Sequence, residues 1–221
     1  MPPALELPGL ERLMEVCQRL GLRLTTSPPR SSPFKAGTRI AGLPLDPMLA
    51  AVYSRLGYAA FATDVAGIVL YHSNDEEQEL EEDNERWLED YRQQLALPTL
   101  IFAGEPAMAY RYATVPSLAN EQGHQPVVRV DVYEDPYAHP IASDVNHFFR
   151  IYSYYLETLM QLPDAREEAG LLTFPWEVPE IIGRDSRLVE MLQAGRFDSL
   201  MSNTEIQGWA REVVEAGLAK A

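Results

Sequence analysis

Hydrophobic residues recur at helical spacing in several stretches of this chain. In residues 7–20 the apolar side chains share one face, and Gly21 provides a stop. Asp46 followed by Pro47 is typical of a helix start, because aspartate caps the first turn and proline fits the first helical position. Asp144 begins a third helix, whose aromatic stripe is broad enough to cover the face of a sheet.

Four further stretches have the composition of β-strands: residues 65–71, 99–103, 109–115 and 127–133. The first is apolar throughout, which predicts a strand buried on both faces. The last alternates valines with Arg129 and Asp131, so one of its faces should meet water or polar neighbours. The proline- and serine-rich residues 25–33 predict a connector without regular structure.

The most acidic segment is residues 75–90, with the sequence DEEQELEEDNERWLED. Ten of its sixteen residues are acidic and one is basic, which gives it a net charge of −9 within a chain of formal charge −15. Its apolar residues nevertheless share one helical stripe: Leu80, Trp87, Leu88, Tyr91 and Leu95. A capping-box pattern leads from Ser73 or Asn74 to Glu76 or Glu77, and the helix should end before Pro98. The segment is therefore predicted to be an ordered helix with one docked face.

Such a concentration of carboxylates repels itself, so it is most useful where a cationic partner comes to meet it. The simpler alternative is a helix face that is merely solvated. We expect a partner-binding surface formed by these carboxylates: Glu76, Glu77, Glu79, Glu81, Glu82, Asp83, Glu85, Glu89 and Asp90.

The elements follow in the order of two helices, a strand, the acidic helix, three strands, a long helix and a helical tail. Because strands do not alternate regularly with helices, we assign the chain to the α+β class. We expect a single domain in residues 1–162, with a mixed, mainly antiparallel sheet flanked by helices. Residues 163–221 are then expected to form a helical C-terminal extension that packs on this domain.

Proline and glycine breaks divide the extension into two short helices, residues 186–194 and 204–217. Asp185 or Ser186 is expected to cap the first of them, and Thr204 the second. Trp176 and Trp209 are expected to pin these helices onto the domain, rather than to serve as exposed binding anchors.

Composition narrows the class of protein further. The net charge of a 221-residue chain at −15 argues against nucleic acid or an anionic membrane as partner. The one cysteine, Cys17, excludes an internal disulfide and a cysteine zinc site, and its place on the first helical stripe predicts a buried core residue. No basic N-terminal region leads into an apolar run, and no apolar stretch approaches the roughly 18 residues that span a bilayer. We therefore expect a cytoplasmic protein.

Candidate chemistry is sparse. His139, Asp144 and His147 are the best candidates for a metal-assisted hydrolase, because zinc binds histidine nitrogen and carboxylate oxygen. They lack a histidine pair on one helix face, so a capping aspartate and two ordinary histidines is the simpler interpretation. Ser143 lacks the glycine-flanked turn of a hydrolase nucleophile, and no glycine pattern indicates a phosphate cradle. We expect no catalytic residue, no metal ligand and no cofactor, so the chain should not be an enzyme.

Four segments together resemble the SUKH superfamily, which includes fungal regulators of cell-wall synthesis and bacterial immunity proteins of polymorphic toxin systems. They are Leu43-Pro44 opening a short helix, LPTLIFAGEPAMAYRY (97–112), PVVRVDVYE (126–134) and HPIASDVNHFFRIYSYYLE (139–157). The likeness covers residues 7–162 and rests on pattern and order. It departs from the family where Leu56-Gly57-Tyr58 replaces an Asn-Gly turn and where the acidic helix looks like an insertion.

The resemblance implies a single α+β domain without enzymatic activity and with a binding role. That role is typically to neutralise a toxin. Nuclease toxins carry basic surfaces, to which an acidic surface such as that of the predicted helix can bind. The alternative from the same family is a regulatory scaffold in cell-wall or other housekeeping assembly. The oligomeric state and the partner's identity are not readable from the sequence.

Overall fold

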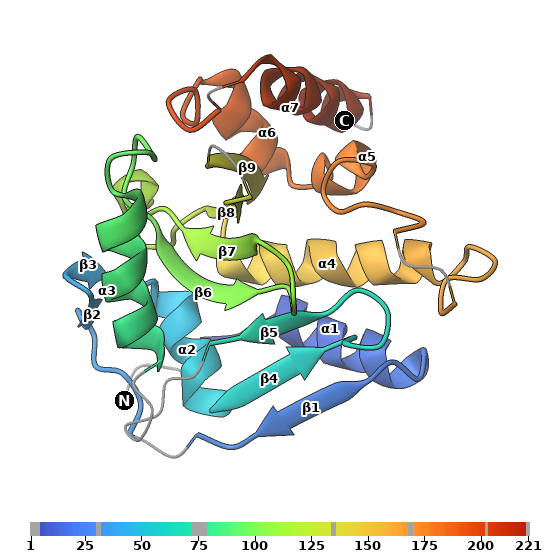
Figure 1. The fold of residues 1–221 in the computed structure, drawn as a ribbon, viewed down its shortest axis with the longest axis horizontal. Coiled ribbons are helices and arrows are strands. Elements are labelled where there is room, and N and C mark those ends of the chain that lie inside the picture. The colour runs from blue at the N-terminus through green and yellow to red at the C-terminus, as the bar shows by residue number, and fades with distance from the viewer. Residues whose placement is uncertain are drawn as a thin grey trace.

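A seven-stranded antiparallel sheet organises the fold of the described residues (Figure 1). The computed structural model describes residues 5–29, 32–71, 79–133, 136–167, 170–201 and 203–219. The strand order is β1–β4–β5–β6–β7–β8–β9, and a small hairpin, β2–β3, lies apart from it. The strands are β1 Leu24–Ser27, β2 Arg39–Ile40, β3 Leu43–Pro44, β4 Tyr58–Phe61, β5 Ile68–Leu70, β6 Leu100–Gly104, β7 Tyr110–Thr114, β8 Val127–Asp131 and β9 Tyr137–Ala142.

Helices surround this sheet, as the α+β assignment expects. They are α1 Pro8–Arg19, α2 Pro47–Arg55, α3 Glu79–Tyr91, α4 Val145–Leu159, α5 Pro179–Ile182, α6 Ser186–Gln193 and α7 Thr204–Leu218, with a 3-10 turn at Pro116–Leu118. The three helices predicted from periodicity and caps are thus confirmed. Asp46 accepts from the amides of Met48 and Leu49, and Asp144 accepts from the amide of His147, as N-caps do.

The long helix α4 covers one face of the sheet with its aromatic stripe, and α1 packs against α4. Phe148 of α4 meets the rings of Phe102 and Tyr112, which come from β6 and β7. The two helices approach so closely at Gly9 that a Cβ there would lie 2.0 Å from the carbonyl oxygen of Asn146. The amide of Gly9 instead donates to the Asn146 side chain. Glycine is therefore required where α1 crosses α4.

Three strands of the seven-stranded sheet escaped the sequence prediction, namely β1, β4 and β9, and so did both strands of the β2–β3 hairpin. Strand β1 overlaps the predicted connector (residues 25–33) at residues 25–27, and it was missed because it is a polar edge strand that is only half covered. Strand β9 contains Pro140, which an edge strand tolerates since it need not donate to a ladder. Leu43-Pro44, expected to open a helix, instead forms β3, and the helix begins at Pro47.

The C-terminal helices α5, α6 and α7 lie beside β9 and the end of α4, at the top of Figure 1. Asp185 caps α6, and its second oxygen accepts from the amide of Ser143, which joins the extension to the start of α4. Asn203 caps α7, so the prediction of Thr204 is wrong by one residue. The division of the chain after residue 162 stays a prediction.

Both tryptophans of the extension hold it to the sheet, as expected. Trp176 and Trp209 lie edge-on against the ring of His139 on β9, with ring centroids 4.4 and 5.0 Å away. The indole N–H of Trp209 also donates to the carbonyl of Pro175.

Cys17 lies fully buried on α1, and burial raises the pKa of its thiol to about 11, so it is an inert core residue at neutral pH.

Candidate functional site

Helix α3 docks on the sheet through the apolar stripe that the sequence predicts. Leu80 and Trp87 of the helix are buried, and Leu88 and Tyr91 are half-buried. Leu95, predicted on the same stripe, is also buried but lies after the end of the helix at Tyr91. The predicted capping box at residues 73–77 lies outside the described residues, and the helix is described from Glu79. Residues 79–90 of the acidic segment therefore lie in an ordered helix with one docked face, at the left of Figure 1.

Two polar side chains fix α3 to strand β6 and to the residue that precedes this strand. The amide nitrogen of Asn84 donates to the carbonyls of Leu80 and Ile101, and its oxygen accepts from the amide of Ile101 at 2.8 Å. The indole N–H of Trp87 donates to the hydroxyl of Thr99 at 2.9 Å. Asn84 meets β6 where the β6–β7 register shifts, so it satisfies backbone groups that the ladder leaves free. These buried hydrogen bonds hold α3 in one orientation.

The nine predicted partner-binding residues have different environments. Glu82, Glu85, Glu89 and Asp90 are exposed. Glu81 accepts a hydrogen bond from the amide of Ala41 at 2.7 Å, so it serves the contact with the β2–β3 hairpin. Glu82 and Asp83 share the guanidinium of Arg86. Glu76 and Glu77 lie outside the described residues, and only the backbone of Glu79 is described.

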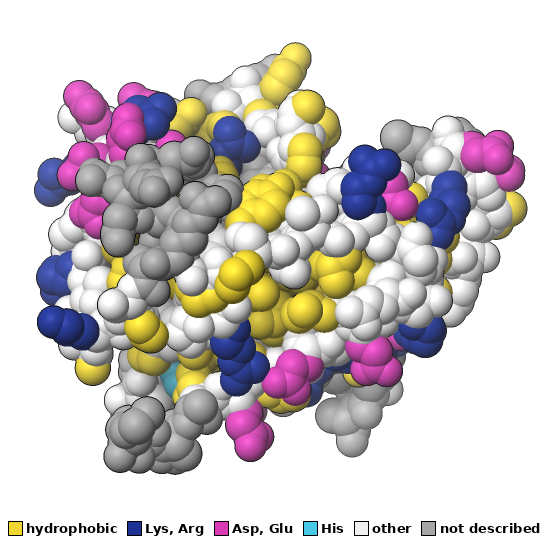
Figure 2. Space-filling view, turned by 90° about the horizontal axis from the view of Figure 1, so that it is seen from below, with side chains coloured by type: hydrophobic (Ala, Val, Ile, Leu, Met, Phe, Trp, Pro, Cys, Tyr) yellow, Lys and Arg dark blue, Asp and Glu magenta, His cyan; other side chains and the backbone are white. Residues whose placement is uncertain are grey.

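An open groove about 590 Å³ in volume runs between α3 and the β2–β3 hairpin. Glu81, Glu85 and Glu89 line its α3 side at intervals of four residues, which places them on one helix face. Ala41 and Gly42 form the opposite wall. Figure 2 shows acidic side chains gathered at the upper left, on the side of the molecule where Figure 1 shows α3. The outward charge of α3 is thus concentrated beside a hollow rather than spread over a flat surface.

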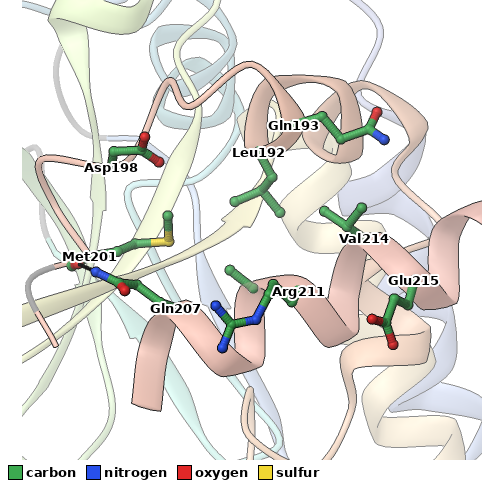
Figure 3. A pocket seen from close by; sticks show the side chains of 9 residues that line it. Leu192, Gln193, Asp198, Met201, Gln207, Arg211, Val214 and Glu215 are labelled. Carbon is green, nitrogen blue, oxygen red and sulfur yellow. Dashed lines mark hydrogen bonds between the residues drawn. The ribbon is translucent and has the colours of Figure 1, made fainter. Parts of the chain in front are cut away.

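A second open cavity, about 520 Å³ in volume, lies between α6 and α7 (Figure 3). Leu192 and Val214 come to it from the two helices, and Met201 comes from the segment between them. Arg211 and Glu215 project from α7 beside these apolar side chains. The rim of this cavity carries Asp198, Arg211 and Glu215, whereas the α3 groove is lined by three glutamates and one cation, Arg92.

The histidine candidates do not form one site. His139 is buried among the rings of Tyr137, Trp176 and Trp209, and both of its ring nitrogens lack hydrogen-bond partners in the described part of the chain. Burial, aided by the charge of Arg129, lowers the pKa of His139 from 6.5 to about 3. Among residues 5–29, 32–71, 79–133, 136–167, 170–201 and 203–219, no group of three or more His, Cys, Asp or Glu residues is placed to hold a metal ion.

Asp144 and His147 instead form a pair at the start of α4. The Oδ2 atom of Asp144 lies 2.9 Å from Nδ1 of His147, and this hydrogen bond raises the pKa of the histidine. Burial works to raise the pKa of Asp144, but its interactions with His147 outweigh burial and lower it. The buried hydroxyl of Ser143 has no hydrogen-bond partner within the described ranges, so the three residues are not linked as a catalytic triad.

A buried ion pair was missed by the sequence analysis. Arg129 of β8 is 1% exposed and donates through Nε to Oε1 of Glu105 at 3.1 Å. The hydroxyl of Tyr112 donates to the same oxygen at 2.8 Å, and the ring of Tyr110 stacks 3.5 Å from the guanidinium carbon. The alternation of valines with polar residues predicted that one face of this strand would meet water or polar neighbours. For Arg129 these neighbours are Glu105 and the two tyrosines. The signal that could have found them is that an arginine in a buried strand requires a carboxylate nearby.

Comparison of the chain with family models, with curated proteins and with solved structures finds no match. Within the described residues, no helix is both long enough and apolar enough to cross a membrane.

Proposed function

We propose that this chain is a non-enzymatic, protein-binding module that recognises a basic partner through the acidic surface of α3. By its resemblance to the SUKH superfamily, we infer further that it is an immunity protein and that the partner is a cognate toxin domain. The observation that carries the proposal is the contrast within α3. Its inner face is held by buried hydrogen bonds of Asn84 and Trp87, while its outer face presents carboxylates.

Three carboxylates of α3 are available to a binding partner. Among the described residues, no ion pair involves Glu85, Glu89 or Asp90, and all three side chains are exposed. Carboxylates on a flexible tail would have to be ordered on binding, which costs conformational entropy. Carboxylates on a docked helix do not incur that cost, so more of the electrostatic attraction appears as affinity.

The class of partner follows from the sign of the charge. Exposed acidic surfaces attract basic ones and raise association rates, by roughly 10 to 1000-fold at low salt. A toxin that acts on nucleic acid needs a basic surface of its own to hold the phosphates. Occupation of that surface by α3 would block the toxin's substrate without any chemistry on the part of this chain.

The test is calorimetric titration of this chain with the toxin domain encoded by the neighbouring gene. The test variant carries Glu85→Gln, Glu89→Gln and Asp90→Asn. A matched control replaces three exposed glutamates on other elements by glutamine: Glu121, Glu190 and Glu212. Both variants lose three charges, so they separate a local effect from an effect of net charge.

We expect the test variant to bind about tenfold more weakly, which corresponds to three partly screened charge interactions. The control should change affinity by less than about twofold. Equal weakening in both variants would attribute the effect to net charge and remove α3 from the interface. Absence of binding to the encoded toxin domain would overturn the immunity assignment.

A further inference from the structure

A cleft about 470 Å³ in volume lies next to the Arg129–Glu105 pair, away from α3. It is formed by the connection after β6, the end of α4 and residues 170–174. Its lining is mainly aromatic and aliphatic, with a few polar side chains, and its volume is typical of small-molecule sites. The aromatic residues that line it are Tyr110, Tyr152, Tyr155 and Phe174.

The guanidinium of Arg129 forms fewer hydrogen bonds than it can. It carries five N–H donors, yet its one hydrogen bond to a described residue is donated by Nε. Its Nη1 atom is buried and has no partner in the described ranges. A buried charged donor without an acceptor costs free energy, and structures tend to keep such a group where something else supplies the acceptor.

Glu105 presents the complementary group. Its Oε1 atom accepts from both Arg129 and Tyr112, whereas Oε2 accepts no hydrogen bond from the described residues. The Glu105 side chain is 21% exposed and lines the same cleft as Arg129. A donor and an acceptor of opposite charge therefore lie side by side at one end of an apolar hollow.

We propose that this cleft binds a free α-amino acid with an apolar or aromatic side chain. Its carboxylate meets the guanidinium of Arg129, its ammonium group meets Glu105, and its side chain packs among the tyrosine rings. A zwitterion suits the site because Glu105 already neutralises Arg129. A simple anion would leave a net negative charge in a desolvated cleft of a protein whose formal charge is −15.

The first arm of the test compares three probes of the same shape by calorimetry and by amide chemical shifts. Phenylalanine carries both charged groups, 3-phenylpropanoate lacks the ammonium, and phenethylamine lacks the carboxylate. We expect phenylalanine to bind and each truncated probe to bind at least about tenfold more weakly, because a buried charge is then left without a partner. Equal binding of 3-phenylpropanoate, or no binding of phenylalanine, leucine or methionine, would overturn the proposal.

The second arm uses variants of the protein. Met108 lines the cleft and is 49% exposed, so Met108→Trp should fill the hollow without disturbing the buried pair. Leu218→Trp is the matched control, because Leu218 is 55% exposed at the end of α7. We expect Met108→Trp to abolish phenylalanine binding while its circular dichroism melt matches that of the control. Undiminished binding to Met108→Trp would place the ligand elsewhere and overturn the assignment.

Glu105→Gln separates recognition of charge from the shape of the cleft. It keeps an oxygen that can accept from Arg129 and Tyr112 but removes the negative charge. We expect phenylalanine to lose its roughly tenfold advantage over 3-phenylpropanoate in this variant. A preference for phenylalanine that survives Glu105→Gln would contradict the role given to Glu105. The α3 variants of the proposed toxin interaction should leave all of these results unchanged.

Discussion

Helix α3 and the β7–β9 face of the sheet use charge in opposite ways. On α3 the docked face is neutral, through Asn84 and Trp87, and the charges point outward. On β8 and β9, by contrast, the ionisable side chains of Arg129 and His139 are buried under α4 and the C-terminal extension. An exposed charge costs little to keep and can serve a partner, whereas a buried one must be matched from within or by a ligand. In the two proposals made for this chain, these regions are separate recognition surfaces, one for a protein and one for a small molecule.

The largest effect is expected from opening the buried region. Trp209→Ala removes a ring that covers His139 and a hydrogen bond to Pro175. We expect the free energy of unfolding to fall by roughly 3–5 kcal/mol, as for other large aromatic truncations in cores. Urea unfolding measures this loss, and Leu218→Ala, at an exposed site on the same helix, should change stability by less than about 0.5 kcal/mol. Equal effects at the two positions would show that α7 does not seal the sheet through Trp209.

A smaller loss is expected where α3 is anchored. Asn84→Ala leaves the N–H and C=O of Ile101 without their side-chain partners. The expected cost is about 2–3 kcal/mol, which is that of buried polar groups left unsatisfied. Glu85→Ala is the control, because Glu85 is exposed one residue away. Hydrogen exchange of the Ile101 amide should accelerate in Asn84→Ala only, and unchanged protection would contradict the anchoring role.

His139 and His147 should give opposite dependences of the free energy of unfolding on pH. The pKa of His139 is lowered to about 3, so the folded state keeps it neutral while the unfolded chain takes up a proton below its usual pKa of 6.5. His139 therefore contributes fully to the free energy of unfolding above pH 6.5. As the pH falls from 7 to 5, this contribution decreases by about 2 kcal/mol. His139→Phe should remove this loss, as measured by urea unfolding at the two pH values.

His147 provides the comparison of opposite sign. Its hydrogen bond to Asp144 raises its pKa in the folded state, so its contribution is present at low pH and is lost as the pH rises through that raised pKa. His147→Gln should therefore steepen the fall in stability between pH 7 and pH 5, whereas His139→Phe flattens it. Changes of the same sign in both variants would contradict the assignment of one neutral and one charge-favoured histidine.

Much of the fold could be predicted because its long helices carry their own signals. The periodic stripe of α4 and the caps Asp46, Asp144 and Asp185 depend only on neighbouring residues, and all lie where expected. Strands β1, β4 and β9 carried no such signal: β1 and β4 have four residues each, with polar or small side chains, and β9 contains a proline. Their pairing is decided by tertiary contacts, which outweigh local propensity in strands.

The candidate sites show the same division. The docked and exposed faces of α3 follow from helical spacing, so the sequence could place Leu80 inside and Glu85 outside. The pairing of Glu81 with the Ala41 amide depends on how a separate hairpin packs, which spacing does not report. Arg129 and Glu105 are likewise 24 residues apart and meet only because their strands join one sheet.

The central claim is that the exposed carboxylates of α3 attract a basic partner. The change in energy expected in its test is the smallest of those considered. The measurement is the association rate constant with the encoded toxin domain, by stopped flow, at about 0.05 and about 0.5 M salt. For the unmodified chain we expect the rate constant to fall at least about tenfold over this range. For the variant with Glu85→Gln, Glu89→Gln and Asp90→Asn, the fall should be several-fold smaller, with a nearly unchanged dissociation rate. A rate constant that is independent of salt, or equally dependent on it in both proteins, would contradict the account.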